Sequence, residues 1–218
     1  MKLAELYDNR FSEREKQKKN ALWAVLCSSF FQQYISEQAC VLDIGAGFCE
    51  FINNIRCREK YALDLNEDIL SYAAPEVHAV QDSLENFLKT HGSIFDVLFM
   101  SNFLEHLKSK EEVLHVLNES HHLLKNNGCI LVLQPNIRYL YREYWDFLDH
   151  HVPISDRSLV EALELTGFSI ELVIPRFLPY TTKSRFPQWP ILVRAYLRMP
   201  FAWKILGKQA FVIGRKHA

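Results

Sequence analysis

Short apolar runs alternate along the chain with stretches whose apolar residues recur every three or four positions. Runs of four to seven residues indicate buried strands, and the three-and-four spacing indicates helices that cover them. This alternation is typical of a parallel sheet with helices on both faces, so an α/β fold is expected. The predicted strands lie near residues 41–44, 60–64, 77–80, 95–101, 129–134, 168–174 and 210–214.

Two of the intervening helices have clear boundaries. One is expected over residues 110–124, with Gly128 in the turn that follows it. Another is expected over residues 155–166, because Ser155 is a suitable N-cap and Gly167 a suitable end. The size of the chain, 218 residues, suits one domain with a large core.

A glycine turn follows the first predicted strand. The strand carries Asp43 near its end and breaks at Gly45 and Gly47. A strand, a glycine turn and a helix allow the backbone to approach a nucleotide-like ligand closely. The next strand ends at Asp64, 21 residues after Asp43, where a carboxylate can accept hydrogen bonds from both ribose hydroxyls.

The residue types after the glycines bear on the choice of ligand. A dinucleotide fingerprint requires glycine at position 50, where this chain has Glu50. A carboxylate there suits the helix dipole but repels a pyrophosphate. A ligand with a cationic sulfonium and no phosphate is therefore favoured over NAD.

The Asp43-x-Gly45-x-Gly47 pattern resembles motif I of the class I S-adenosylmethionine-dependent methyltransferases, and similar motifs follow in order over residues 38–175. The family often has a third glycine where this chain has Cys49. The resemblance implies a Rossmann-like, doubly wound, seven-stranded sheet, mostly parallel, with an antiparallel seventh strand between the fifth and sixth. It also implies a set of residues that bind S-adenosylmethionine: Asp43, Gly45, Ala46, Gly47, Asp64, Leu65, Asp82, Ser83, Asn102 and Phe103.

Simpler roles stay open for several of these residues. Asp43 and Asp64 could act only as strand-end caps, and Asp82 could be a solvated turn residue. Asn102 could cap a helix that begins near Phe103.

Under this resemblance the chain is one methyltransferase domain, residues 1–218. A helical cap over residues 1–37 precedes a cofactor-binding core over residues 38–134. Two stretches outside the alternating scaffold, residues 135–154 and 175–207, are expected to form the acceptor pocket, because ligands bind beyond the carboxyl ends of parallel strands.

Three histidines are candidates for a general base, since imidazole titrates near neutrality. His151 best matches the family pattern, and His150 and His106 are alternatives. Each could instead hydrogen-bond the loop backbone or line the pocket wall. Glu105 and His106 with either His150 or His151 could offer metal ligands, but Asn102, in the position of a further acid, is a poor ligand for such a site, so no metal is expected.

Within the first of the two acceptor-side stretches, residues 136–145 are rich in aromatic rings and arginines. Arg138 and Arg142 are four residues apart, so on a helix they share one face. Together with Tyr139 and Tyr180 they could bind a sugar, phosphate or carboxylate group. Simple helix packing explains the rings equally well.

Charge is strongly separated along the chain. All 26 acids lie at or before Glu171; residues 172–218 carry nine bases, and residues 1–171 have a net charge of −10. This separation predicts an anionic partner. Residues 191–206 interleave apolar and basic residues, as in segments that lie on anionic membranes, although a lid helix would look similar.

Composition limits the location. No uncharged apolar run reaches 18 residues and the N-terminus lacks an apolar signal core, so neither a membrane span nor secretion is expected. The five cysteines form no CxxC pair and indicate reduced thiols. We expect a cytoplasmic protein, with contact at the inner membrane face as an option.

The chain as a whole resembles bacterial methyltransferases that accompany polysaccharide-building enzymes. This implies O-methylation of a small-molecule, glycan or lipid-linked acceptor, with S-adenosylhomocysteine as product and no nucleic-acid partner. Two other classes stay open: a non-enzymatic membrane-surface adaptor with a vestigial nucleotide pocket, and a nicotinamide-dependent oxidoreductase.

Overall fold

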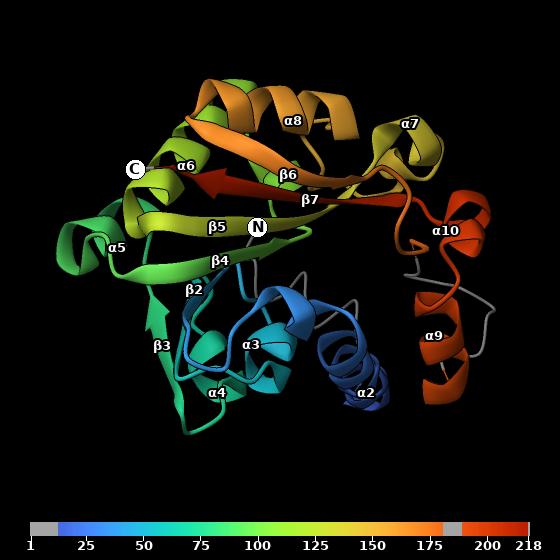
Figure 1. The fold of residues 1–218 in the computed structure, drawn as a ribbon, viewed down its shortest axis with the longest axis horizontal. Coiled ribbons are helices and arrows are strands. Elements are labelled where there is room, and N and C mark those ends of the chain that lie inside the picture. Colours follow the sequence, from blue (N-terminus) through green and yellow to red (C-terminus); the bar gives the residue numbers. More distant parts are fainter. Residues whose placement is uncertain (1–12, 181–188, 218) are drawn as a thin grey trace. The chain divides into compact units, whose positions relative to one another are not determined.

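The computed structural model describes residues 13–180 and 189–217 (Figure 1). The described residues divide into two compact units: residues 13–83 with 189–199, and residues 84–180 with 200–217. The strands are β1 (Cys40–Ile44), β2 (Glu59–Asp64), β3 (Val77–Gln81), β4 (Phe95–Ser101), β5 (Leu124–Pro135), β6 (Phe168–Ile174) and β7 (Gln209–Lys216), and the sheet has the order β3-β2-β1-β4-β5-β7-β6. The first three of these strands belong to the first unit and the other four to the second. This is the predicted α/β class, with a seven-stranded, mostly parallel sheet and an antiparallel seventh strand.

The first unit contains three parallel strands, β1 (Cys40–Ile44), β2 (Glu59–Asp64) and β3 (Val77–Gln81). All five residues of β1 are buried, as its continuous apolar run predicts. Asp43 pairs with Ala62, and Asp64 pairs with Gln81. This register brings the carboxyl ends of the three strands to one edge.

The helices of the first unit are α2 (Glu13–Ser29), η1 (Phe31–Tyr34), α3 (Glu50–Asn54), α4 (Ile69–Tyr72) and α9 (Pro190–Leu197). Helix α2 packs against α3 and α9. Trp23 is 8% exposed, and its ring lies 5.9 Å from Phe31 and 6.3 Å from Phe51, so it belongs to the core.

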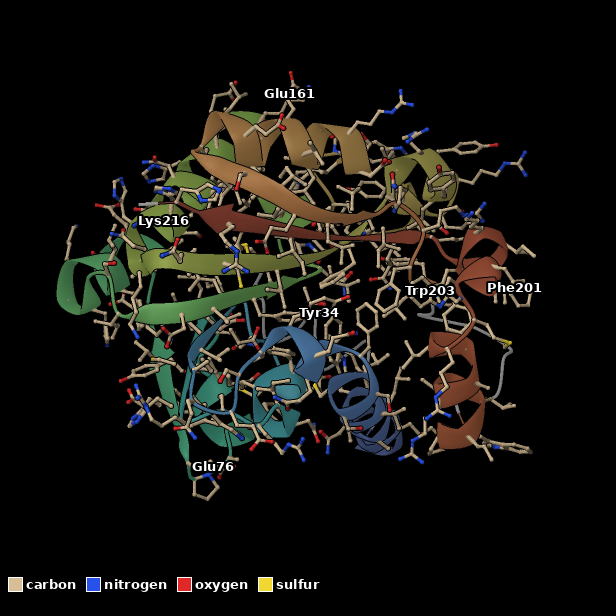
Figure 2. All side chains as sticks on the ribbon, in the orientation of Figure 1. Tyr34, Glu76, Glu161, Phe201, Trp203 and Lys216 are labelled. Atoms are coloured by element: carbon tan, nitrogen blue, oxygen red, sulfur yellow. The ribbon has the colours of Figure 1, made fainter. Side chains whose placement is uncertain are left out.

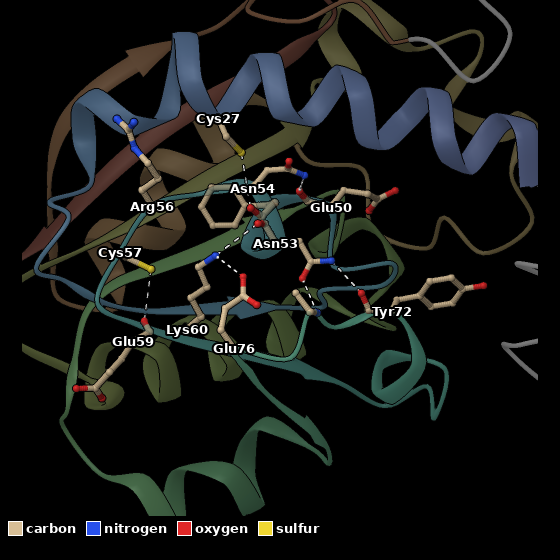
Figure 3. A network of polar contacts seen from close by, with 12 residues as sticks. Cys27, Glu50, Asn53, Asn54, Arg56, Cys57, Glu59, Lys60, Tyr72 and Glu76 are labelled. Atoms are coloured by element: carbon tan, nitrogen blue, oxygen red, sulfur yellow. Dashed lines mark hydrogen bonds and ion pairs between the residues drawn. The ribbon is translucent and has the colours of Figure 1, made fainter.

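Polar contacts hold α3 in place (Figure 3). The Asn53 side chain donates to Tyr72 O at 2.8 Å and accepts the Ala74 N–H at 2.9 Å. Lys60 Nζ reaches both Asn53 O and Glu76 Oε1 at 3.4 Å. Because α3 begins directly after the glycine turn, these contacts also limit the movement of that turn.

The second unit contains β4 (Phe95–Ser101), β5 (Leu124–Pro135), β6 (Phe168–Ile174) and β7 (Gln209–Lys216). Strands β4 and β5 are parallel, whereas β7 runs antiparallel between β5 and β6. The expected position of the seventh strand is therefore confirmed.

The helices of the second unit are α5 (Leu84–His91), η2 (Leu104–His106), α6 (Lys110–Leu123), α7 (Ile137–Leu140), η3 (Tyr144–Asp146), α8 (Asp156–Leu165) and α10 (Pro200–Leu206). Helix α8 begins with a capping box: Ser155 Oγ accepts the Ser158 N–H at 3.1 Å, and Ser158 Oγ accepts the Ser155 N–H at 2.8 Å. Gly167 follows the helix with φ 90°. Both predicted ends of this helix are confirmed.

The turn predicted at Gly128 is wrong, because β5 begins at Leu124 directly after α6. Its pairing with β4 shifts register, and Asn127, with φ 63°, takes the left-handed conformation. Gly128 is needed for a different reason. A Cβ there would lie 2.9 Å from Leu124 Cδ2 and 3.0 Å from Lys125 O.

Within residues 13–180 and 189–217, no helix combines the length and apolar character that crossing a bilayer requires. The cysteines at positions 27, 40, 49, 57 and 129 are all free thiols.

Candidate functional site

In the first unit, the turn from β1 to α3 lies in left-handed backbone. Gly45, Gly47 and Cys49 have φ values of 69°, 51° and 58°. The N–H groups of Gly45 and Ala46 both donate to Leu63 O, at 2.8 and 3.2 Å, which ties the turn to β2. A cysteine in this conformation costs about 1–2 kcal/mol relative to glycine. This explains why glycine suits position 49 in sequences with the same motif.

Asp64, the last residue of β2, is hydrogen-bonded to this turn. Its Oδ2 accepts the Gly47 N–H at 2.8 Å, and its Oδ1 accepts the Asn66 N–H at 2.9 Å. Each carboxylate oxygen can accept a further hydrogen bond. The structure thus brings Asp64 to the glycines as the spacing predicts. Its binding to a ribose stays a prediction.

The end of β3 adds three more predicted cofactor residues. The Asp82 N–H donates to Asp64 O at 3.1 Å, and Asp82 Oδ1 accepts the Ser83 N–H at 2.7 Å. Leu65 is 65% exposed at the tip of β2. The structure therefore brings Leu65, Asp82 and Ser83 to the same edge as Asp64.

Carboxylates surround the turn. Asp43 is 3% exposed. Burial, and after it the charges of Glu50 and Asp64, raise the pKa of Asp43 well above its usual range, while a hydrogen bond from the Ile52 N–H opposes the shift. Lys19 Nζ lies 3.0 Å from Glu50 Oε1. Such surroundings favour a cationic ligand over a phosphate.

The variant Asp43→Asn is expected to flatten the pH dependence of stability. Because the pKa of Asp43 is raised in the folded state, the folded protein binds this proton more tightly than the unfolded chain does. The contribution to stability is complete below the unfolded pKa of about 3.9 and is lost as pH rises toward the raised folded pKa. Urea unfolding of wild type and variant at about pH 5 and about pH 8 measures the difference. An equally steep decline in both proteins would contradict the burial argument.

The variant Gly47→Ala is expected to obstruct the ligand. A Cβ at Gly47 would have no heavy atom within 4 Å, so a methyl group would enter the open space beside the turn. Gly92→Ala is the matched control, because Gly92 has φ 58° and equally open surroundings at the end of α5. Both variants carry the same strain of about 1–2 kcal/mol. Only Gly47→Ala should weaken S-adenosylhomocysteine binding in calorimetry, by at least about tenfold. Equal affinities in the two variants would exclude the turn as the ligand site.

In the second unit, Asn102 follows β4 with φ 49°. Its N–H donates to Leu133 O at 2.9 Å and its Nδ2 donates to Ser101 Oγ at 3.2 Å. Helix η2 begins after Phe103 and has no side-chain cap. The capping role considered for Asn102 is therefore wrong. Asparagine tolerates the left-handed backbone conformation, and residues in this conformation are common at functional sites.

Beyond Asn102, three potential ligand side chains gather. Glu105 and His106 lie on η2, and His150 lies in the loop before α8. One ligand atom from each lies within 4.8 Å of the others. Glu105 is fully buried, His150 is 6% exposed and the His106 side chain is 26% exposed. The structure thus brings together two of the three predicted histidines.

Glu105 is held by its backbone more than by its side chain. Its carbonyl oxygen accepts the N–H groups of His151 at 2.8 Å and Val152 at 3.3 Å. Within the described residues, no hydrogen bond of ordinary geometry reaches its carboxylate. Burial raises the pKa of Glu105 to about 7; the His106 charge and the nearby Gln134 amide oppose this shift.

Asp149 orients His106. His106 Nδ1 lies 2.9 Å from Asp149 O and 3.3 Å from Asp149 Oδ2, so Nδ1–H is the donor in both contacts. Sequence reasoning missed Asp149, although its place directly before His150 was a visible signal. The ring of His151 is exposed, and its role as a base stays a prediction.

The predicted pairing of Arg138 and Arg142 on one helix is wrong, because α7 ends at Leu140. Arg138 Nη1 instead lies 2.9 and 3.0 Å from the two carboxylate oxygens of Asp156. Arg142 Nε donates to Tyr141 OH at 3.0 Å.

The two predicted tyrosines contact different partners. The guanidinium groups of Arg138 and Arg176 lie 5.4 and 4.7 Å from the Tyr139 ring centroid. The Tyr180 ring lies 5.9 Å from Phe147, which stacks on His150 at 4.9 Å. Of the predicted acceptor residues, Tyr180 is thus connected to the histidine cluster through a ring contact. Acceptor binding by all four residues stays a prediction.

Comparison with known proteins places these features in context. A family model described as a methyltransferase domain matches residues 7–173. No curated protein matches the sequence. A S-adenosylmethionine-dependent methyltransferase from Archaeoglobus fulgidus is 21% identical over 99% of this chain and 100% of its own, with a TM-score of 0.68. One from Methanosarcina mazei is 16% identical over 86% of this chain and 96% of its own, with a TM-score of 0.63. At these identities the structural similarities establish the fold.

Proposed function

Because the chain belongs to the methyltransferase domain family, we propose that it transfers a methyl group from S-adenosylmethionine to a hydroxyl group of a small-molecule, glycan or lipid-linked acceptor. S-adenosylmethionine is the cofactor and S-adenosylhomocysteine the product. In the transfer, the acceptor oxygen forms a bond to the methyl carbon opposite the sulfur. The carbon–sulfur bond breaks and its electron pair stays on sulfur. Catalysis is then mostly positioning, with removal of the hydroxyl proton.

The observation that carries this proposal is the hydrogen bond between the Asp64 carboxylate and the glycine turn. One carboxylate holds the Gly47 N–H at 2.8 Å and keeps lone pairs for a ribose diol. The nearby carboxylates of Glu50 and Asp64 suit a sulfonium and disfavour a pyrophosphate. This combination supports S-adenosylmethionine over a nicotinamide dinucleotide.

The cluster of Glu105, His106 and His150 supports a hydroxyl acceptor. An alcohol is a poor nucleophile until its proton is weakened or removed. These are the groups after β4 that can assist, and His106 is the most accessible of the three. A sulfur or amine acceptor would need less help of this kind.

Thermal unfolding with S-adenosylhomocysteine, NAD and NADP in parallel tests the cofactor. A ligand at 100 times its Kd stabilises the folded state by about 2.7 kcal/mol, which only S-adenosylhomocysteine should achieve. Methyl-labelled donor incubated with lipid and small-molecule cell extracts then tests the acceptor. Label released as methanol by mild alkali indicates an ester and contradicts hydroxyl transfer. Label that survives mild alkali is then assigned by mass spectrometry of the product: a methyl group on oxygen supports hydroxyl transfer, and one on nitrogen, sulfur or carbon contradicts it. Binding without any transferred label would favour the adaptor.

We also propose that helix α9 contacts an anionic membrane surface. Trp189 and Ile191 are 66% and 72% exposed, and Arg194 and Arg198 are exposed nearby. No ion pair involves these two arginines within residues 13–180 and 189–217. Exposed rings beside unpaired cations are typical of interfacial helices.

Helix α10 in the second unit has the same character. Phe201 is 65% exposed at its outer edge, whereas Trp203 lies 5.1 Å from Phe177 (Figure 2). Sedimentation with phosphatidylcholine vesicles, with and without phosphatidylglycerol, tests the contact. Replacing both Arg194 and Arg198 with alanine should weaken binding to the anionic vesicles about 30-fold, at about 1 kcal/mol per charge. Arg157→Ala, an exposed position on α8, is the control. Equal binding to both vesicle types would exclude the charge-based contact.

A further inference from the structure

The cluster formed by Glu105, His106 and His150 has the composition of a metal site. Its carboxylate and two imidazoles come from two separate segments, η2 and the loop before α8. One ligand atom from each residue lies within 4.8 Å of the other two. Metal–ligand bonds of about 2.0–2.2 Å would draw these atoms slightly closer together.

We propose that Glu105, His106 and His150 bind one divalent transition-metal cation, of the class of Zn²⁺ or Fe²⁺. Two imidazoles and one carboxylate suit these borderline ions. Mg²⁺ and Ca²⁺ prefer oxygen ligands only, so they are disfavoured here.

Glu105 gives the independent reason to place a cation here. Its side chain is fully buried, and within the described chain its carboxylate has only a poorly placed contact with the Gln134 amide. A buried polar group without a well-placed partner costs roughly 1–3 kcal/mol, and more if it is charged. A coordinated cation would satisfy the carboxylate and offset this cost.

Asp149 completes the arrangement from outside the ligand set. Metal-binding histidines generally donate their second N–H to a carboxylate or a backbone carbonyl, which fixes the ring and its tautomer. His106 Nδ1 has both partners, Asp149 O at 2.9 Å and Asp149 Oδ2 at 3.3 Å. The lone pair of Nε2 is therefore the one offered to a cation.

Three protein ligands leave coordination positions for another molecule. The His106 side chain is 26% exposed, so that side of the cluster is open. A role of the cation in catalysis rests on the proposed function, whereas binding of the cation does not. A cation held by Glu105, His106 and His150 would lower the pKa of a hydroxyl group beside it, so that the hydroxyl proton could pass to solvent as the acceptor oxygen bonds to the methyl carbon and the carbon–sulfur bond breaks. The histidines act as ligands in this scheme, not as bases.

Metal titration of the full chain without a histidine tag tests the site. After treatment with a chelator, Co²⁺ is added and followed by visible absorption, and Zn²⁺ is measured by competition. Wild type should bind one equivalent. Glu105→Gln and His150→Asn should each weaken binding by at least about 100-fold. Removing a residue that is hydrogen-bonded to a ligand typically lowers metal affinity roughly 10–100-fold, and removing a ligand itself should lower it more. Asp149→Asn should fall within that smaller range.

Two control variants separate this site from adventitious binding. His115 on α6 lies 3.4 Å from Glu119, an exposed histidine beside a carboxylate, and His115→Gln should bind like wild type. Cys57 is a half-buried thiol, and Cys57→Ser should also leave binding unchanged.

The proposal is overturned if wild type binds neither ion, or if binding survives in both Glu105→Gln and His150→Asn. Should Glu105→Gln lose its circular dichroism spectrum, His106→Asn serves in its place, because His106 is partly exposed. S-adenosylhomocysteine titrated into the same chelated samples distinguishes the two ideas. If these samples bind S-adenosylhomocysteine but no metal, this inference alone is refuted. If they do not bind S-adenosylhomocysteine, the proposed function is refuted.

Discussion

Asp64→Ala is expected to weaken S-adenosylhomocysteine binding by about 10²–10⁴-fold. Two hydrogen bonds from ribose hydroxyls to a carboxylate are worth about 1.5–3 kcal/mol each, and every 1.4 kcal/mol is tenfold in affinity. The substitution also frees the N–H groups of Gly47 and Asn66, which now donate to the two carboxylate oxygens at 2.8 and 2.9 Å. Isothermal titration measures the change.

A modified ligand separates the ribose contact from the support of the turn. Methylthioadenosine and its 2′,3′-dideoxy analogue differ only in the diol. Wild type should prefer the diol strongly, and Asp64→Ala should show little preference, because the partner of both hydroxyls is gone. An equal preference in the two proteins would show that Asp64 acts only through the glycine turn.

Glu67→Ala is the matched control for charge. Glu67 lies three residues away, is exposed and carries the same charge. Its removal should leave affinity within about twofold, since exposed charges in water interact weakly. If Glu67→Ala weakens binding as much as Asp64→Ala does, a general loss of negative charge explains both results. A direct contact between Asp64 and the ribose would then not be needed.

The sequence predicted the position of Asp64 because two local rules acted together. An apolar run of four to six residues sets where a buried strand ends, and parallel strands present their carboxyl ends at one edge. Asp43 and Asp64 therefore had to lie near the glycine turn once both runs formed adjacent strands. The capping box at Ser155 was predictable for the same reason, because it depends only on residues within one turn of helix.

Features that depend on distant partners were not predictable. Arg138 was expected to face Arg142 along a helix, but its partner is Asp156, 18 residues later. The role of Gly128 arises from contacts with Leu124 and with β4. Asp149 gained its role only when the loop folded back onto η2. Periodicity reports which face of an element is buried, but not which side chain arrives to cover it.

The pair of Arg138 and Asp156 gives the second large prediction, because it decides whether Arg138 is available to an acceptor. Asp156 is 5% exposed and accepts from Arg138 Nη1 at 2.9 Å and from Asn136 Nδ2 at 2.8 Å. It also lies in the first turn of α8, where a negative charge is favourable.

Asp156→Ala should lower the free energy of unfolding by about 2–3 kcal/mol. The loss combines the hydrogen bonds with the helix-dipole term, and is limited because the Arg138 side chain, 37% exposed, can be partly solvated. At about 2–4 °C per kcal/mol, the midpoint should fall by roughly 4–12 °C. Glu161→Ala, an exposed position on the same helix, is the control and should change stability by less than about 0.5 kcal/mol.

Arg138→Ala should cost a similar amount, because it leaves a buried carboxylate without its cation. The double variant should cost clearly less than the two single changes added together, with a coupling of about 1–2 kcal/mol. Additive losses, or an Arg138→Ala protein as stable as wild type, would show that the ion pair does not stabilise the fold. Arg138 would then be free to bind an acceptor phosphate or carboxylate, as its position in the sequence first suggested.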